Sequence, residues 1–216
     1  MIPSMTRNGL LLALFGLAAA GLVALTHEGT KDRIAEQQKQ QLVATLAQIL
    51  PGDLYNNAPH DDCRLLQSRQ YLGTREPQPA FIARRDSEPV AMAMETVAPD
   101  GYNGDIHLIV GIRWNGEILG VRTLNHNETP GLGDLIDIRR SDWVTRFSGY
   151  QLESEKDPRF AVKRDGGEFD QFTGATITPR AYVKAVKNAL IYFNSNKAKL
   201  LQAPRCWSEN EQGAQP

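Results

Sequence analysis

The longest uninterrupted apolar segment lies near the N-terminus, over residues 9–26 (GLLLALFGLAAAGLVALT). Its 18 residues contain no charge and no proline, and as a helix they would span roughly 27 Å, close to the ~30 Å hydrocarbon core of a bilayer. Because helices in soluble cores seldom stay apolar on every face, the pattern predicts a transmembrane helix. The run continues through Leu22, Val23 and Leu25, beyond the small residues that suit signal-peptide cleavage, which favours an uncleaved anchor.

An amphipathic helix is predicted directly after this segment. Thr30 would be its N-cap, and Pro51 would stop it near Leu50. Its first half, residues 31–41, is mostly polar and is typical of a stalk that leaves a membrane. Apolar residues then recur at helical spacing, at Leu42, Val43, Leu46, Ile49 and Leu50. We therefore expect the compact domain to begin near residue 43.

A second helix is predicted close to the C-terminus. Thr178 would be its N-cap and Pro179 its first helical residue, because proline suits a position whose N–H has no helical partner. Its apolar face would consist of Val183, Val186, Ala189, Leu190 and Phe193.

Between these helices the sequence is rich in alternating and β-branched apolar residues. Four strands are expected, over Phe81–Arg84, Val90–Ala98, Ile106–Trp114 and Glu117–Leu124. Asn115-Gly116 separates the last two and predicts a hairpin with a type I′ turn. Residues 51–79 are rich in Asn, Asp, Pro and Gln and are expected to be mainly loop. Strands in the middle with helices at both ends indicate an α+β fold.

Composition and charge narrow the class of protein. The chain has 216 residues, of which 41% are apolar, enough for a packed globular core and too many for a disordered chain. Its 24 Lys and Arg residues are balanced by 25 Asp and Glu residues, for a net charge of -1. A nucleic-acid-binding protein needs a basic face to meet phosphates. The sequence therefore indicates one globular domain with an attached anchor and no nucleic-acid partner.

The two cysteines, Cys63 and Cys206, lie far apart in the sequence. No CxxC or Cys/His spacing indicates a metal site. If the domain is exported, the two thiols could form a disulfide between the start of the domain and its C-terminal end. Two unrelated thiols are the alternative, because sequence alone does not give the Cα separation.

Two loops have the composition of a binding site. Residues 126–134 carry a Glu-Thr pair among glycines and a proline, a combination that lets backbone N–H groups approach a ligand closely. Residues 170–179 carry three threonines and a glycine just before a helix, where free N–H groups and the helix dipole favour a phosphate. Ordinary turns are the alternative for both loops. His126 and Glu128 lack a third ligand nearby, so no metal site is expected.

Motifs within these loops resemble those of a known family. The segment Asp170-x-x-Thr173-Gly174-Ala175-Thr176 resembles the flavinylation motif, Asp-x-x-Ser/Thr-Gly-Ala-Thr, of proteins that carry covalently bound FMN. The loop from Glu128 to Gly133, Glu-Thr-Pro-Gly-Leu-Gly, resembles the second signature of the same FMN-binding domain. With its anchor, stalk and C-terminal helix, the chain is similar over nearly its whole length to the family of G subunits of the Rnf (Rsx) electron-transport complex.

The resemblance implies a cofactor and its attachment. In the family the last threonine of the motif, here Thr176, is esterified by the FMN phosphate, and a separate flavin transferase makes the bond with FAD as donor. Asp170 would belong to the sequence read by the transferase, and Thr173, Gly174 and Ala175 complete the motif. Thr176 is therefore expected to be a modification acceptor, and no residue of the chain is expected to be catalytic.

The resemblance also implies contacts with the flavin ring. Glu128, Thr129 and Leu132 would contact the isoalloxazine, and Tyr102 would stack on it. Lys163 would balance charge near the flavin, since a positive group favours an anionic reduced ring.

The family layout implies an α+β FMN-binding domain with a central antiparallel or mixed sheet, flanking helices and a single N-terminal transmembrane helix. The expected parts are a cytoplasmic N-terminus (1–8), the anchor (9–26), a stalk (27–50), a periplasmic FMN-binding domain (51–205) and a tail (206–216). The chain would relay electrons in the bacterial inner membrane with other Rnf/Rsx subunits as partners. The homologous C subunit of the sodium-translocating NADH:quinone reductase, a stand-alone periplasmic FMN protein and a scaffold without cofactor are the alternatives.

Overall fold

The computed structural model describes residues 2–207, and these fall into two compact units that divide between Leu42 and Val43. The first unit consists of helix, and the second contains all the strands. Helix α1 (Ile2–Ile49) is continuous across the division.

Helix α1 contains one segment that is long and apolar enough to cross a bilayer. The large side chains of this segment, such as Leu10, Phe15 and Leu25, are all exposed. Thr30 lies inside α1, and its hydroxyl donates a hydrogen bond to the carbonyl oxygen of Thr26 at 2.8 Å, so the prediction that Thr30 caps a separate helix was wrong. The following residues are mostly Lys, Glu, Gln and Ala, which are good helix formers, so the helix continues through the polar stretch.

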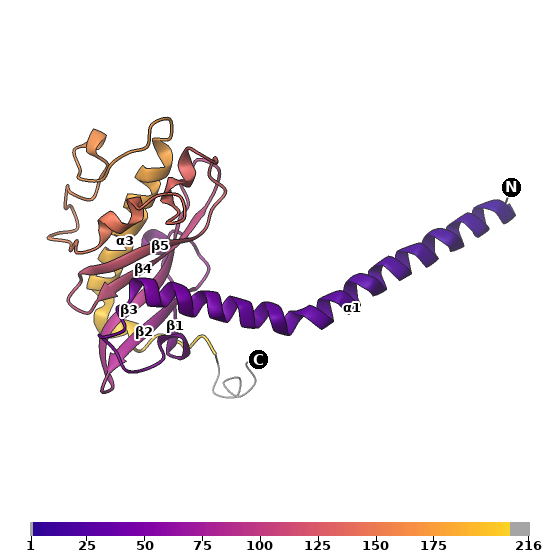
Figure 1. Cartoon of the computed structure of the whole chain (residues 1–216), viewed down its shortest axis with the longest axis horizontal. Coiled ribbons are helices and arrows are strands. Elements are labelled where there is room, and N and C mark those ends of the chain that lie inside the picture. The colour runs from indigo at the N-terminus through magenta and orange to yellow at the C-terminus, as the bar shows by residue number, and fades with distance from the viewer. Residues whose placement is uncertain (1, 208–216) are drawn as a thin grey trace. The chain divides into compact units, whose positions relative to one another are not determined.

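The second unit is built on a five-stranded sheet in which every neighbouring pair is antiparallel (Figure 1). The spatial order β1-β2-β3-β4-β5 follows the chain. The strands are β1 (Cys63–Leu66), β2 (Gln78–Arg85), β3 (Glu88–Ala98), β4 (Ile106–Arg113) and β5 (Ile118–Asn125). The four predicted strands are confirmed with adjusted ends, and the sheet is antiparallel throughout.

Strand β1 falls within the stretch that was expected to be loop. The same stretch also contains the short helix α2 (Arg69–Leu72) and the 3-10 turn η1 (Pro59–Asp61). Strand β1 has only four residues, three of them buried, so it shows no alternation of apolar and polar positions that the sequence could reveal.

The β4–β5 hairpin uses a different turn from the one expected. At the β4–β5 hairpin Gly116 has a φ of 100°, whereas Asn115 is not in the positive-φ region, and the Gly116 N–H donates to the Arg113 carbonyl at 2.8 Å. This is a turn followed by a left-handed glycine, so the type I′ prediction was wrong. The β2–β3 hairpin instead has two central residues with positive φ, Asp86 at 50° and Ser87 at 74°.

Helix α3 (Ile177–Leu200) covers one face of the sheet (Figure 1). The predicted apolar face of this helix is confirmed, because all five of its residues are buried. Its strand partners in the core include Ile82, Met92, Met94, Leu108 and Val110. Its contacts with the sheet are mainly with β3 and β4.

The end of α1 packs on the opposite face of the sheet. Leu46, Ile49 and Leu50 are buried, and Ile49 lies directly over Gly111 and Gly120. Successive residues of a strand point to opposite faces, so Gly111 faces away from its core neighbour Val110. This end of α1 belongs to the second unit, which begins at Val43.

Glu95 lies in the middle of β3, where burial raises the pKa of its carboxyl from 4.5 to about 7. Between pH 4.5 and pH 7 the folded chain therefore holds a proton that the unfolded chain has lost, and the free energy of unfolding decreases as the pH rises. The loss amounts to about 3 kcal/mol across this window.

We therefore expect Glu95→Gln to unfold at higher urea concentration than the wild type at pH 8, and to lack the decrease between pH 4.5 and pH 7. Urea denaturation of the detergent-solubilised chain at a series of pH values measures this. Glu88→Gln, at the exposed start of the same strand, is the matched control and should follow the wild type. Equal slopes for Glu95→Gln and the wild type would contradict the prediction.

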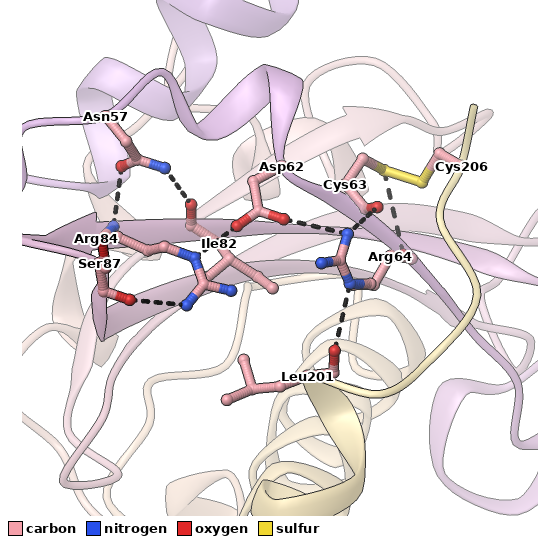
Figure 2. A network of polar contacts seen from close by, with 9 residues as sticks. All are labelled: Asn57, Asp62, Cys63, Arg64, Ile82, Arg84, Ser87, Leu201 and Cys206. Carbon is pink, nitrogen blue, oxygen red and sulfur yellow. Dashed lines mark hydrogen bonds and ion pairs between the residues drawn. A yellow bond between two sulfur atoms is a disulfide. The ribbon is translucent and has the colours of Figure 1, made fainter. Parts of the chain in front are cut away.

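Residues 204–206 lie along the edge strand β1 and are bonded to it (Figure 2). Cys63 and Cys206 form a disulfide with a Cα–Cα distance of 5.4 Å. The Leu65 N–H donates to the Pro204 carbonyl at 2.8 Å, and the Cys206 N–H donates to the Cys63 carbonyl at 3.3 Å. The edge strand β1 is therefore covered by the chain's own C-terminal residues.

A polar network beside the disulfide strengthens this attachment (Figure 2). The carboxylate of Asp62 lies between two guanidinium groups, 3.0 Å from Arg64 and 2.6 Å from Arg84. The Arg64 Nε also donates to the carbonyl oxygen of Leu201 at 3.4 Å. Asp62 thus joins β2 to the start of β1, and the buried Arg64 joins both to the residue that follows α3.

Candidate functional site

The two loops singled out in the sequence meet at one cavity of about 270 Å³. Three segments form it: the β3–β4 loop, the loop after β5 and the start of α3. The lining residues are Tyr102, Glu128, Thr129, Leu132, Gly133, Gly174, Ala175, Thr176, Ile177 and Thr178. Seven of the ten residues predicted for cofactor binding therefore surround a single cavity.

The rim of the cavity is apolar and faces solvent. Tyr102, Leu132 and Ile177 are 66%, 42% and 45% exposed. Among the described residues that follow Val43, these three are all of the exposed large hydrophobic side chains. Ile177 was not among the predicted contacts. An exposed apolar surface confined to one cavity is typical of a binding site.

Thr176 occupies the N-cap position of α3 on the cavity wall, half-buried. Its side chain makes no capping hydrogen bond, so the hydroxyl is not committed to the helix. The first N–H groups of an α-helix lack intrahelical partners and favour a negative charge. A threonine hydroxyl and a helix N-terminus thus lie together at the cavity.

The predicted start of α3 was wrong by two residues. The helix begins at Ile177, with Thr176 as N-cap, so Thr178 and Pro179 lie in its first turn. Thr178 does not cap the helix because its hydroxyl donates a hydrogen bond to Oε2 of Glu128. Proline is tolerated here, because first-turn N–H groups have no helical partner.

Gly174 shapes the turn that carries the motif toward the cavity. It has a φ of 82°, in the left-handed region that glycine adopts without strain. The Ala175 N–H donates to the Phe172 carbonyl at 3.2 Å and closes this turn. A Cβ on Gly174 would lie 3.3 Å from Leu132. The two motifs are therefore in close contact.

Glu128 is buried at the base of the cavity, with 4% of its surface exposed. Its Oε1 accepts a hydrogen bond from the backbone N–H of Asn103 at 3.1 Å, and its Oε2 accepts from Thr178. Its own backbone N–H donates to Nδ1 of His126 at 3.1 Å. Within the described part of the chain, no three His, Cys, Asp or Glu residues are grouped to hold a metal ion.

The remaining predicted residues lie outside the cavity lining. Asp170 forms an ion pair with Lys163, with 2.5 Å between Oδ1 and Nζ. Thr173 is exposed. The motif is thus split between a cavity-facing half, from Gly174 onward, and an outward-facing half that presents Asp170.

An aromatic cluster centred on Trp143 packs against the first residues of the motif. The Nε1 of Trp143 donates to the carbonyl oxygen of Asp170 at 2.8 Å. Its ring packs edge-on against Phe172, 5.0 Å between centroids, and against Tyr182, 5.5 Å between centroids. Trp143 was not predicted as a site residue, since only the folded chain brings it beside residues 170–172.

Comparison with known proteins places this geometry in a family. Residues 101–191 match the FMN-binding domain, and residues 1–49 match the RnfG N-terminal region. The chain is 55% identical over 212 residues to the G subunit of the ion-translocating oxidoreductase complex of Shewanella piezotolerans, an alignment that covers 98% of this chain and 100% of that protein. The chain belongs to the family of G subunits of the ion-translocating oxidoreductase complex.

Other G subunits of this family are nearly as similar. The protein of Shewanella loihica is 58% identical over 204 residues, with 94% of this chain and 96% of that protein covered. The protein of Vibrio cholerae is 49% identical over 204 residues, with 94% and 97% covered. The similarity extends over the anchor and the domain alike, so the apolar helix and the family together make the chain a single-pass membrane protein.

The FMN-binding region of this G-subunit chain contains the whole cavity, because every lining residue falls between positions 101 and 191. The residues present fit FMN by their chemistry. Exposed apolar and aromatic groups at the rim suit a flavin ring, and the helix N-terminus with Thr176 suits its phosphate.

Proposed function

We propose that this chain is a membrane-anchored electron-transfer protein that carries FMN through a phosphoester bond to Oγ of Thr176. The observation that carries the proposal is the position of Thr176: its hydroxyl lies on the cavity wall, at the N-terminus of α3, without a capping hydrogen bond. A phosphate joined there would lie in the positive end of the helix dipole. The covalent bond would keep the cofactor on a carrier that faces a compartment poor in free flavin.

The rest of the cavity would hold the isoalloxazine. Tyr102 would stack on the ring, and Leu132 and Ile177 would cover its apolar edge, which accounts for their exposure. Glu128 and Thr129, which also line the cavity, would supply polar contacts. When bound, FMN supplies one-electron and two-electron transfer, and the protein residues hold and orient it.

We infer that a separate flavin transferase makes the bond. In the reaction with FAD, the Thr176 oxygen would attack the FMN phosphorus, the phosphoanhydride bond would break, and AMP would leave while the hydroxyl proton is lost to a base. An unactivated threonine hydroxyl needs a base and a metal to react. Glu128, a buried carboxylate that lines the cavity, is already hydrogen-bonded to Thr178 and Asn103. Asp170, at the outward-facing half of the motif, is available to a docking enzyme.

The relatives are named as members of an ion-translocating oxidoreductase complex, so we propose that the chain works with the other Rnf/Rsx subunits in the bacterial inner membrane. The domain would lie on the periplasmic side and the N-terminus on the cytoplasmic side. The Cys63–Cys206 disulfide supports this orientation, because disulfides persist in oxidising compartments such as the periplasm.

The test is expression of the full chain with an active flavin transferase, followed by a denaturing gel and peptide mapping. We expect a fluorescent band, and a peptide containing residues 170–180 that carries the mass of FMN less one water. Co-expression with an inactivated transferase is the control and should give a dark band. A dark band beside the active transferase, shown to work on another substrate, would overturn the proposal.

A further inference from the structure

A buried hydrogen bond that the sequence did not predict joins the loop of residues 126–134 to the start of α3. The hydroxyl of Thr178 donates to Oε2 of Glu128 across 50 residues of sequence. Thr178 is fully buried, and Glu128 is 4% exposed. A hydrogen bond to a charged group is stronger than a neutral one, and more so in a buried site.

Glu128 joins all three segments of the cavity. Its Oε1 accepts from Asn103, whose neighbour Tyr102 forms part of the rim. Its Oε2 accepts from Thr178, two residues after Thr176. The carboxylate itself belongs to the loop that supplies the third segment. One side chain therefore determines the relative position of the ring-binding walls and of the attachment hydroxyl.

Two glycines pack closely against this carboxylate. A Cβ on Gly133 would lie 2.9 Å from Oε2 of Glu128 and 3.0 Å from the hydroxyl of Thr178. A Cβ on Gly101 would lie 2.9 Å from Oε1. Glycine backbone therefore lies close to both carboxylate oxygens, and a side chain at either glycine would press on the hydrogen-bonded pair.

We propose that Glu128 and Thr178 are positioning residues for flavin attachment. They fix the N-terminus of α3, and with it the Thr176 hydroxyl, relative to Tyr102 and the loop of residues 128–133. The distance between the Thr176 hydroxyl and the ring-binding residues would then match the distance between the phosphate and the ring of one flavin. This inference rests on the proposed attachment at Thr176 and assigns roles to two residues that contribute no atom to the new bond.

The decisive comparison is Thr178→Val against Thr178→Ser. Valine keeps the shape and removes the hydroxyl, whereas serine keeps the hydroxyl. A misplacement of about 1 Å can cost about 100-fold in rate, so we expect valine to slow attachment by about 10- to 100-fold and serine to stay within about threefold of wild type. Glu128→Gln keeps the size of the side chain and removes its charge, and should also slow attachment.

The measurement uses the purified full chain in detergent, with purified transferase and FAD, and follows the initial rate of in-gel fluorescence. Thr123→Val is the matched control. Thr123 donates to the carbonyl oxygen of Ile136 at 2.6 Å and contacts the Tyr182 hydroxyl, so its loss weakens the fold away from the cavity. Thermal unfolding of each flavin-free variant is recorded in parallel.

The proposal is supported if Thr178→Val is slow, Thr178→Ser is fast, and Thr123→Val attaches flavin normally at a similar loss of thermal stability. It is overturned if Thr178→Val reacts at the wild-type rate, or if Thr123→Val is slowed equally. If Thr178→Val does not fold, Thr178→Ala takes its place in the same comparison with Thr178→Ser. A wild-type chain that stays dark overturns the attachment at Thr176 as well, which separates the two failures.

Discussion

Replacing Thr176 by alanine is expected to abolish covalent flavin completely. The substitution removes the oxygen that would bond to phosphorus. It leaves the rest of the cavity wall and α3 in place, since Thr176 makes no capping hydrogen bond. Expression beside the transferase, a denaturing gel and flavin fluorescence measure the effect. The band should be dark even though the protein is made and folded.

Thr176→Ser and Thr173→Ala are the matched controls for this experiment. Serine restores a hydroxyl at the same position, so fluorescence should return. Thr173 is exposed and lies outside the cavity lining, so its alanine variant should still acquire flavin. A fluorescent Thr176→Ala band would contradict the assignment and move the attachment site to another threonine of the motif.

Removal of the disulfide is expected to have the largest effect on stability. The bond between Cys63 and Cys206 closes a loop with a sequence separation of 143. In the chain-entropy description such a long loop strongly restricts the unfolded state, and the free energy of unfolding should fall by about 3–5 kcal/mol when the bond is lost. Cys206→Ser, studied by urea denaturation in detergent, measures this loss.

The double variant Cys63→Ser/Cys206→Ser provides the internal check. Both single variants and the double variant lack the same bond, so all three should be destabilised by similar amounts. Adding reductant to the wild type should reproduce the effect, and adding it to the double variant should change nothing. A loss below about 1 kcal/mol would show that the hydrogen bonds to the C-terminal segment hold it without the disulfide.

Local sequence patterns predicted the elements of the domain better than their ends. The Asn115-Gly116 pair correctly located the β4–β5 hairpin, because glycine adopts the left-handed conformation there. The turn type was wrong, since the conformation of Asn115 also depends on the register of the flanking strands. Asp86 and Ser87 form a two-residue turn with positive φ and without glycine, and a composition rule does not detect such a turn.

The start of α3 shows why local rules failed at the site. Thr178 followed by proline has the composition of a helix N-cap, yet its hydroxyl is used by Glu128, 50 residues earlier. Thr178 therefore does not cap the helix, because it makes a tertiary contact with a residue too distant in the sequence for a local rule to detect. The same holds for Trp143, whose indole supports Asp170 from a separate turn.

The candidate site was located in the sequence by its motifs and by resemblance. Composition alone left an ordinary turn open as the alternative for each loop, and spacing did not reveal that the two loops share a cavity. The structure adds Ile177 at the rim and the Glu128–Thr178 hydrogen bond at the base. It places Lys163 beside Asp170 rather than among the cavity-lining residues.

The order of the strands has a consequence for biosynthesis. Each strand pairs with the strand made just before it, so the sheet can grow hairpin by hairpin while the chain is still being synthesised. The residues that cover β1, around Pro204 and Cys206, are made after all five strands. Until they arrive, a nascent chain presents an open hydrogen-bonding edge to its neighbours. Truncation before residue 203 would make that state permanent and favour aggregation.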